Sequence, residues 1–535
     1  MKIITKMKVI LLLACVFTSC KNKVEESKAE NITALENKTD EEDMYRPNFH
    51  FTPNKGWMND PNGMFFYNGY YHLYFQHYPY GNKWGPMHWG HATSTDMITW
   101  KEQPIALYPD ELGYIFSGSA VVDLENTTGF STDGKIPVVA MFTYHDMEAE
   151  KAGKIIDETQ AIAYSLDEGI TYTKFEGNPV VENPNIPDFR DPKVNWDADR
   201  KQWTMVLAAG QEIMFYGSKD LKEWNLLSKF GEGVGNHDGV WECPDFFPLP
   251  VKGTEDTKWV LLVSINPGGP NSGSATQYFI GDFDGKTFQI DESFQKEQAK
   301  EHTFWVDHGR DNYAGVTWSN VTTAEGGKLF IGWMSNWLYA NDVPTEKWRS
   351  ATTIARELGL IKDDNTYRLV SSPVKELNDY RGKKVVDKNI SIAGETVLTT
   401  TEIISLSKTE INFILSDVAN GKYTFTLSNS QGDKLKFGYD GTLNKFFVDR
   451  KEAGRINFSE KFSDKMATAI RTSDATELTG KIILDKTSIE IFYDQGQTVM
   501  TEIFFLNAPF NALSIKSDLE SFTLNTIEIN QLNFN

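Results

Sequence analysis

The sequence predicts an all-β protein in which a β-propeller is followed by a β-sandwich. Four segments repeat one pattern: an alternating strand, a tight turn with an aspartate, and an aromatic residue on the returning strand. The turn aspartates are Asp96, Asp167, Asp220 and Asp284, which lie 71, 53 and 64 residues apart. The pattern is typical of β-hairpins, and repeats of this size, with about four strands each, are typical of propeller blades.

The second observation is a change of pattern beyond about residue 380. Segments 423–427, 435–439 and 488–491 alternate apolar with polar or small residues, and short turns separate such segments. Strict alternation predicts half-buried antiparallel strands, for which a β-sandwich is the natural arrangement. We therefore expect a propeller over residues 46–365, a linker over 366–380 and a sandwich over 381–535.

The N-terminus is typical of a targeting segment. Three lysines precede an apolar run over residues 9–17, and Thr18-Ser19 lead directly into Cys20. The run is too short to span a bilayer and fits a secretory signal over residues 1–20. Small residues before a cysteine resemble a bacterial lipobox, which predicts lipidation of Cys20 and an anchor in the bacterial envelope, periplasmic or surface-exposed. An ordinary signal peptide with an incidental cysteine is the alternative, and the acidic segment 21–45 reads as a disordered tether.

Composition excludes several classes of function. The formal charge of −21 argues against a nucleic-acid partner, although simple solubility explains it best. A length of 535 residues suggests two to four domains. Cys15 would leave with the signal, so Cys243 would be the one thiol in the folded part and no disulfide could form within a monomer. No metal-binding motif is present, and we expect neither a metal nor a cofactor.

Four short motifs carry the chemistry. Residues 57–63 read Trp-Met-Asn-Asp-Pro-Asn-Gly, in which proline and Asn-Gly hold Asp60 on a stiff corner. Phe116-Ser117-Gly118, Arg190-Asp191-Pro192 and Trp241-Glu242-Cys243-Pro244-Asp245 come later in the chain, in that order. From about residue 48 to the C-terminus the chain resembles glycoside hydrolase family 32, the invertase, inulinase and levanase family.

This resemblance implies a five-bladed propeller, which matches five units between residues 48 and 365. One motif falls near the start of each unit: Asp60, Ser117, Asp191, Glu242 and the stretch 307–313. If each motif lies on the innermost strand of its blade, all of them converge on one mouth of the central axis.

The resemblance also implies the catalytic roles. Asp60 matches a nucleophile that attacks the anomeric carbon of a fructosyl unit, and Glu242 matches the general acid/base. Asp191 matches a third carboxylate that stabilises the transition state, and Arg190 beside it is expected to keep it ionised. Retention of configuration is implied, with the two reacting carboxyl groups roughly 5–5.5 Å apart. Cys243 reads as a small buried filler.

The remaining matched positions predict a substrate pocket. Its hydrogen-bonding residues and aromatic walls are expected to be Trp57, Asn59, Gln76, Trp84, Phe116, Ser117, Arg190 and Trp337 (or Trp333 in place of Trp337). Trp89 and Trp100 read as packing residues. Segment 76–79 reads Gln-His-Tyr-Pro where many relatives have Gln-Tyr-Asn-Pro, which leaves the shape of this loop open.

The predicted function is exo-acting release of terminal β-D-fructose from levan, inulin or sucrose. An endo-levanase or endo-inulinase is the nearest alternative, because the sequence contains no loop geometry that would separate a pocket from a groove. A fructosyltransferase differs only in the acceptor of the fructosyl unit. A non-catalytic fructan-binding protein is disfavoured, since Asp60, Asp191 and Glu242 are all present.

Overall fold

The computed structural model describes residues 44–363 and 366–534. The predicted signal peptide, Cys20 and all but the end of the tether lie outside these residues. Residues 47–535 form one compact unit, which contains the propeller and the sandwich. Among the described residues no helix is both long and apolar enough to cross a membrane.

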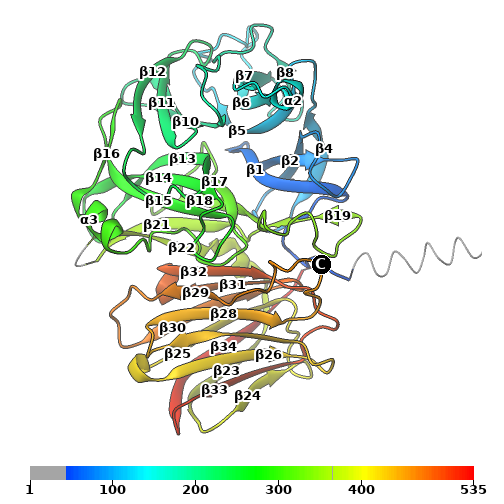
Figure 1. The fold of residues 1–535 in the computed structure, drawn as a ribbon, viewed down its shortest axis with the longest axis vertical. Coiled ribbons are helices and arrows are strands. Elements are labelled where there is room, and N and C mark those ends of the chain that lie inside the picture. Colours follow the sequence, from blue (N-terminus) through cyan, green and yellow to red (C-terminus); the bar gives the residue numbers. More distant parts are fainter. Residues whose placement is uncertain (1–43, 364–365, 535) are drawn as a thin grey trace, which may run out of the picture. The chain divides into compact units, whose positions relative to one another are not determined.

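Seven sheets, antiparallel except for one short parallel pairing, make up this unit, which confirms the all-β prediction. Five sheets, coloured blue to green in Figure 1, are consecutive along the chain and are the blades of a propeller. The first strand of each blade contacts the first strand of the next, and the fifth contacts the first, so these five strands surround the axis. Two six-stranded sheets, yellow to red, come after them as a β-sandwich.

The first three blades each contain four strands. Blade 1 contains β1 (Gly56–Tyr67), β2 (Tyr70–Tyr78), β3 (His88–Ser94) and β4 (Lys101–Leu107). Blade 2 contains β5 (Tyr114–Val122), β6 (Val138–His145), β7 (Glu158–Ser165) and β8 (Thr173–Lys174), with helix α2 (Met147–Lys151) between β6 and β7. Blade 3 contains β9 (Phe189–Asp197), β10 (Gln202–Ala209), β11 (Glu212–Ser218) and β12 (Asn225–Phe230).

The last two blades are less regular. Blade 4 contains β13 (Val240–Pro250), β14 (Thr257–Asn266), β15 (Ala275–Phe283) and β16 (Phe288–Ile290), with helix α3 (Glu292–Lys300) after them. Blade 5 contains β17 (Tyr313–Thr317), β18 (Lys328–Met334), β21 (Arg356–Lys362) and β22 (Tyr367–Pro373), and the short β20 (Ala351–Thr352) also pairs with β18. Strand β19 (Trp348–Arg349) pairs in parallel with β1 and so links the end of the propeller to its start.

The repeated aspartates lie where the sequence predicts them, in the turn between the third and fourth strands of a blade. Asp96 Oδ1 accepts the backbone N–H groups of Ile98 and Thr99 at 2.9 Å each. The carboxylates of Asp167, Asp220 and Asp284 accept N–H groups of their own turns in the same manner. A short polar side chain that satisfies the turn backbone explains why aspartate recurs there.

The predicted end of the propeller is wrong by one strand. β22 runs over residues 367–373, inside the expected linker, and pairs with β21 along its whole length. The connection is therefore limited to the 3₁₀ helix Lys375–Tyr380 and its flanks. The sequence does not reveal this outer strand, because polar residues lie on both sides of the turn between β21 and β22 and such a composition is typical of a linker.

The sandwich begins at residue 381. One sheet contains β23 (Arg381–Ile392), β25 (Thr409–Leu415), β30 (Leu478–Leu484), β31 (Ser488–Tyr493), β32 (Thr498–Ile503) and β34 (Phe522–Leu532). The other contains β24 (Thr396–Thr400), β26 (Lys422–Ser428), β27 (Lys434–Asp440), β28 (Lys445–Glu452), β29 (Ala467–Ile470) and β33 (Ala512–Ser517). Two further 3₁₀ turns span Val418–Asn420 and Asp494–Gly496.

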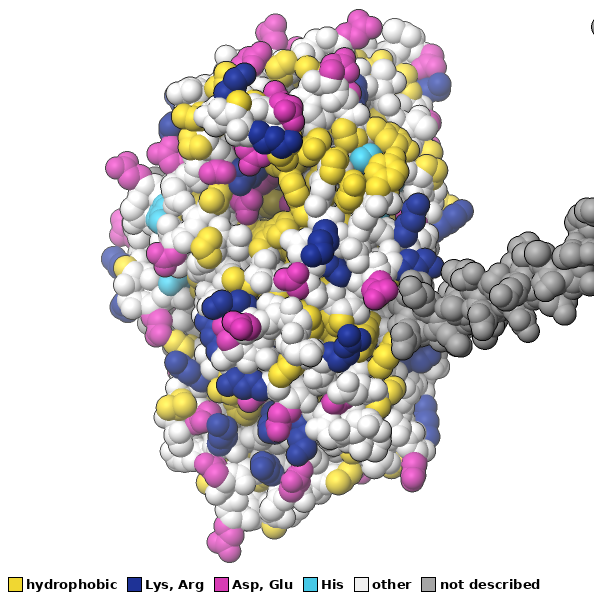
Figure 2. Space-filling model, turned by 45° about the vertical axis from the view of Figure 1, so that its right-hand side comes forward, with side chains coloured by type: hydrophobic (Ala, Val, Ile, Leu, Met, Phe, Trp, Pro, Cys, Tyr) yellow, Lys and Arg dark blue, Asp and Glu magenta, His cyan; other side chains and the backbone are white. Residues whose placement is uncertain are grey.

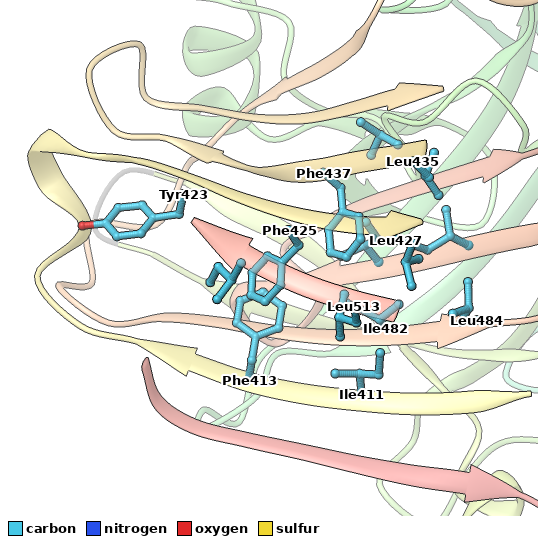
Figure 3. Close-up of a cluster of buried hydrophobic side chains, with 14 of the residues drawn as sticks. Ile411, Phe413, Tyr423, Phe425, Leu427, Leu435, Phe437, Ile482, Leu484 and Leu513 are labelled. Carbon is cyan, nitrogen blue, oxygen red and sulfur yellow. The ribbon is translucent and has the colours of Figure 1, made fainter. Parts of the chain in front are cut away.

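Alternate residues of both sheets fill the sandwich core. Figure 3 shows Phe413 beside Phe425, and Phe437 directed toward the same layer. The rings of Phe425 and Phe437 stack with centroids 5.3 Å apart. Burial of these side chains, each removing roughly 150–250 Å² of surface from water, is what holds the two sheets together.

Candidate active site

Every inner strand of the propeller breaks its pairing at the predicted motif. The register with the neighbouring strand shifts between Met58 and Pro61 in β1 and between Ile115 and Gly118 in β5. Corresponding shifts occur in β9 near Asp191, in β13 after Glu242 and in β17 after Tyr313. A β-bulge redirects the side chain that it carries. Five bulges on five adjacent strands therefore aim five motifs at one end of the axis.

Proline explains why three of these bulges occur where they do. Pro61 ends the break of β1, and Pro192 and Pro244 lie inside the breaks of β9 and β13. Proline has no N–H to give to the sheet, so it is tolerated in a strand mainly at an edge or a bulge. Asp191 and Cys243 directly precede two of these prolines and adopt positive φ angles of 66° and 44°.

The bulges open into a cavity of about 650 Å³. Figure 2 shows a hollow with acidic side chains in it and hydrophobic side chains gathered beside it. Ten of the eleven catalytic and substrate-binding residues predicted from the sequence line the cavity: Asn59, Asp60, Gln76, Trp84, Phe116, Ser117, Arg190, Asp191, Glu242 and Trp337.

Trp57 is the exception, and the prediction that it forms a wall of the pocket is wrong. Its side chain is fully buried and stacks on Trp337, with centroids 5.7 Å apart. Its indole N–H donates to Asn59 Oδ1 at 2.7 Å, so Trp57 supports the pocket from behind. Trp333 is fully buried too, and Trp89 and Trp100 pack in cores as expected.

Asp60 is held by three donors. Ser117 Oγ donates to its Oδ2 at 2.6 Å, Asn59 Nδ2 donates to its Oδ1 at 2.9 Å, and the Cys243 thiol lies 3.5 Å from Oδ2. Burial raises the pKa of Asp60, and these three hydrogen bonds oppose that rise. Hydrogen bonds to both oxygens thus fix the orientation of the Asp60 carboxylate.

Glu242 has a different environment. Arg190 donates to its Oε1 at 3.0 Å, and the Tyr313 hydroxyl donates to its Oε2. Burial raises the pKa of Glu242 and the charge of Asp60 adds to this, whereas Arg190 and Tyr313 act in the opposite direction. The net shift of the pKa is upward. Tyr313 lies in the stretch 307–313, which the sequence predicts to face the axis.

Asp191 differs from the prediction in one respect. Arg190 was expected to keep this carboxyl ionised, but the Arg190 guanidinium makes its close contacts with Asp188, Glu158 and Glu242 and reaches only to 4.0 Å from Asp191. Burial raises the pKa of Asp191 to about 8; the charge of Arg190 opposes this rise, and that of Glu242 adds to it. Arg190 and Asp191 are neighbours at a bulge, where their side chains point in different directions. They therefore do not form a close ion pair.

Cys243 connects two of the three carboxyl groups. Its backbone N–H donates to Asp191 Oδ2 at 2.9 Å, and its thiol lies 3.5 Å from that oxygen as well as from Asp60 Oδ2. Burial raises the pKa of this thiol, so it stays protonated and able to donate. Cys243 therefore orients both acids and is more than the filler that the sequence suggested.

Two residues of the site carry no sequence signal. Glu158 starts β7 and lies 3.1 Å from Arg190, and His145 ends β6, 3.5 Å from Glu158. Burial acts to raise the pKa of Glu158, but Arg190 and His145 lower it. The His145 ring stacks on Phe116 at 4.2 Å. Only the pairing of β6 with β7 brings these residues to the cavity, so no short motif could have revealed them.

The chemistry that these side chains can perform is acid–base and nucleophilic. In the described ranges 44–363 and 366–534, no group of three or more His, Cys, Asp or Glu residues could hold a metal ion. Glycoside hydrolysis requires a pair of carboxyl groups in unlike environments, and here such a pair lies at the mouth of a propeller. Fold and site together define a propeller glycosidase.

The particular family is shown by comparison with known proteins. Residues 50–373 match the model of the glycosyl hydrolases family 32 N-terminal domain, and residues 376–531 match that of the family's C-terminal domain. The chain therefore belongs to glycosyl hydrolases family 32 and is a glycoside hydrolase.

Two curated relatives place it within the family. It is 47% identical over 464 residues to a levanase of Bacillus subtilis strain 168, an alignment that covers 86% of this chain and 66% of the levanase. It is 37% identical over 493 residues to an extracellular exo-inulinase of Aspergillus niger, covering 86% of this chain and 89% of that protein.

Solved structures agree with this assignment. The crystal structure of exo-inulinase from Aspergillus awamori matches with a TM-score of 0.82 and 34% identity, covering 91% of this chain and 98% of that one. The β-fructofuranosidase from Schwanniomyces occidentalis, complexed with fructosyl-erythritol, matches with a TM-score of 0.80 and 35% identity. That alignment covers 92% and 99% of the two chains.

Proposed function

We propose that this protein is a retaining β-fructosidase that releases terminal fructose from fructans and sucrose. The observation that carries the proposal is the unlike setting of Asp60 and Glu242 in one cavity. Asp60 is oriented by Ser117 and Asn59, whereas Glu242 lies between a guanidinium and a phenol. The relatives named levanase, exo-inulinase and β-fructofuranosidase supply the substrate class.

The reaction takes two steps. Asp60 Oδ attacks the anomeric carbon as the bond to the leaving oxygen breaks, and Glu242 gives its proton to that oxygen. Glu242 then takes a proton from water, whose oxygen attacks the same carbon and releases Asp60. The expected carboxyl separation for this double displacement is roughly 5–5.5 Å. Because burial raises the pKa of all three carboxyls, the cluster retains the proton that the first step needs.

Exo action is the expected mode. A cavity of about 650 Å³ at the end of the propeller axis suits the terminal unit of a chain. The lining of this cavity includes Ile155 and Asp188 as well as Trp84, Trp337 and Asn341.

The products of hydrolysis test this function. The protein is incubated separately with levan, inulin and sucrose, and the products are resolved over time. Free fructose from the earliest point is the expected result. An early ladder of oligosaccharides would replace the exo assignment with an endo enzyme, and the absence of any product would favour a non-catalytic binding protein. The anomeric configuration of the first product, monitored by NMR, tests retention.

Tyr313→Phe is expected to change the pH dependence. The Tyr313 hydroxyl stabilises the ionised form of Glu242, so its loss raises the pKa of the acid further. The alkaline limb of kcat/KM should move to higher pH, and the maximum should fall by about tenfold or more. Tyr216→Phe, a change at another buried tyrosine, provides the control. An unchanged pH profile would show that Tyr313 does not act through Glu242.

A further inference from the structure

An exposed group of aromatic rings lies in blade 1 beside the cavity. Tyr80 is 75% exposed and Tyr108 is 52% exposed, and they are among the most exposed large hydrophobic side chains in the described part of the chain. The ring of His88 lies between them, with centroids 5.9 Å from Tyr80 and 5.5 Å from Tyr108. We call Tyr80, His88 and Tyr108 the aromatic platform.

Strand register places the platform at the edge of the blade where the cavity opens. Trp57, at the start of β1, pairs with Tyr78 at the end of β2. His88 starts β3 opposite the end of β2, and Leu107 ends β4 opposite the start of β3. Tyr80 and Tyr108 come just after these strand ends. The platform therefore runs outward from the end of β2, which pairs with the strand β1 that carries Asp60, to the end of the outer strand β4.

One loop joins the platform to the cavity. Residues 79–87 carry Tyr80 at one end and Trp84, which lines the cavity, near the other. The loop packs over the Tyr78 ring so closely that a Cβ at Gly85 would lie 2.9 Å from it. The backbone N–H of Trp84 donates to Asn341 Oδ1 at 3.2 Å. Both aromatic side chains are thus presented by one anchored segment.

The chemistry of the platform suits an uncharged sugar chain. Burial lowers the pKa of His88, so its ring is neutral at neutral pH. Flat apolar rings with hydroxyl edges offer contact area and hydrogen bonds to a neutral polyol. A protein partner would need roughly 800 Å² of surface on this side. Three rings, of which His88 is 5% exposed, fall short of that area.

We propose that the exposed rings of Tyr80 and Tyr108, which are supported by the buried ring of His88, bind the inner units of a fructan chain whose terminal unit occupies the cavity. This inference rests on the proposed function and adds to it a site that acts only on polymers. A sucrose molecule is too short to reach from Asp60 to the outer strand of the blade. Long chains gain contacts that sucrose does not, so the platform should favour polymer over disaccharide.

The test compares substrates of different length. In Tyr80→Ala/Tyr108→Ala, KM for levan, inulin or both should rise by about five- to tenfold, while kcat/KM for sucrose stays within about twofold of wild type. Tyr80→Phe/Tyr108→Phe keeps the rings and should retain most of the polymer affinity. Tyr70→Ala is the matched control, because Tyr70 is 50% exposed at the opposite edge of the same blade.

Two results would overturn the platform. One is an unchanged KM for both polymers, and the other is an equal loss on polymers and sucrose. If the wild-type protein released fructose from no substrate, the proposed function would fail first. Retardation of Asp60→Ala in native gels containing levan or inulin would then still decide on the platform. If adding Tyr80→Ala and Tyr108→Ala to this variant abolishes the retardation, the platform is supported. If the retardation is unaltered, the platform is contradicted.

Discussion

Replacing Asp60 by asparagine should reduce the rate of fructose release by about 10⁴-fold or more. Asparagine keeps the size of the side chain, and its amide oxygen can still accept from Asn59, while the Ser117 hydroxyl can rotate to accept from the amide nitrogen. The site therefore keeps its shape and loses only the proposed nucleophile. The measurement is kcat on sucrose and on a fructan, with the unfolding temperature recorded alongside.

Ser117→Ala separates orientation from attack. It removes one donor to Asp60 and leaves the carboxylate, so the expected loss in kcat is about 10- to 100-fold, well short of that in Asp60→Asn. Retention of more than about 1% of the wild-type rate by Asp60→Asn would exclude Asp60 as the nucleophile. Asp191 or Glu242 would then have to supply the attacking oxygen.

Local chemistry explains which parts of the site could be predicted from the sequence. Asp60, Asp191 and Glu242 lie in motifs in which a proline and a bulge are adjacent in the chain, so a few consecutive residues determine the backbone. The turn aspartates of the blades are predictable for the same reason. The carboxylates of Asp96 and the other turn aspartates accept backbone N–H groups two to four residues away.

The errors arise where tertiary contacts decide. Trp57 belongs to the motif of Asp60, but its stacking on Trp337 turns the indole into the core. Arg190 contacts Glu158 and Glu242, which lie 32 and 52 residues away, rather than its neighbour. Asp307, in the stretch expected at the axis, instead pairs with Arg356 and Thr501. These contacts join residues that are far apart in the sequence, so no pattern within one segment could have predicted them.

Asp307 belongs to a buried network between the propeller and the sandwich. Arg356 of β21 donates to Asp307 at 2.9 Å and forms an ion pair with Glu490 of β31. The His50 ring lies 2.8 Å from both Asp485 and Glu490. All of these ionic groups are essentially inaccessible to solvent. Each charge is tolerable in such a place only because its partners are present.

The protonation of His50 links this network to pH. Burial acts to lower the pKa of His50, but Asp485 and Glu490 outweigh it and raise the pKa to about 9. The unfolded value is near 6.5. Stabilisation by the imidazolium is therefore fully present below about pH 6.5 and is lost as the pH rises through about 9. The unfolding temperature of the wild type should fall more steeply between about pH 6.5 and 9 than that of His50→Gln.

Glu490→Gln should be among the most destabilising single substitutions in the protein. It removes the carboxylate shared by His50 and Arg356 and leaves two buried cations with one fewer counter-charge. Breaking a buried pair in this way costs about 3–5 kcal/mol, which corresponds to a fall in the unfolding temperature on the order of 5 °C for a chain of this size. Glu452→Gln is the matched control, because Glu452 is exposed, its partner Lys436 is only partly buried, and such surface pairs contribute less than about 1 kcal/mol. Equal, small shifts in both variants would mean that the network is neutral to stability and that the apolar contacts between the two domains suffice to hold them together.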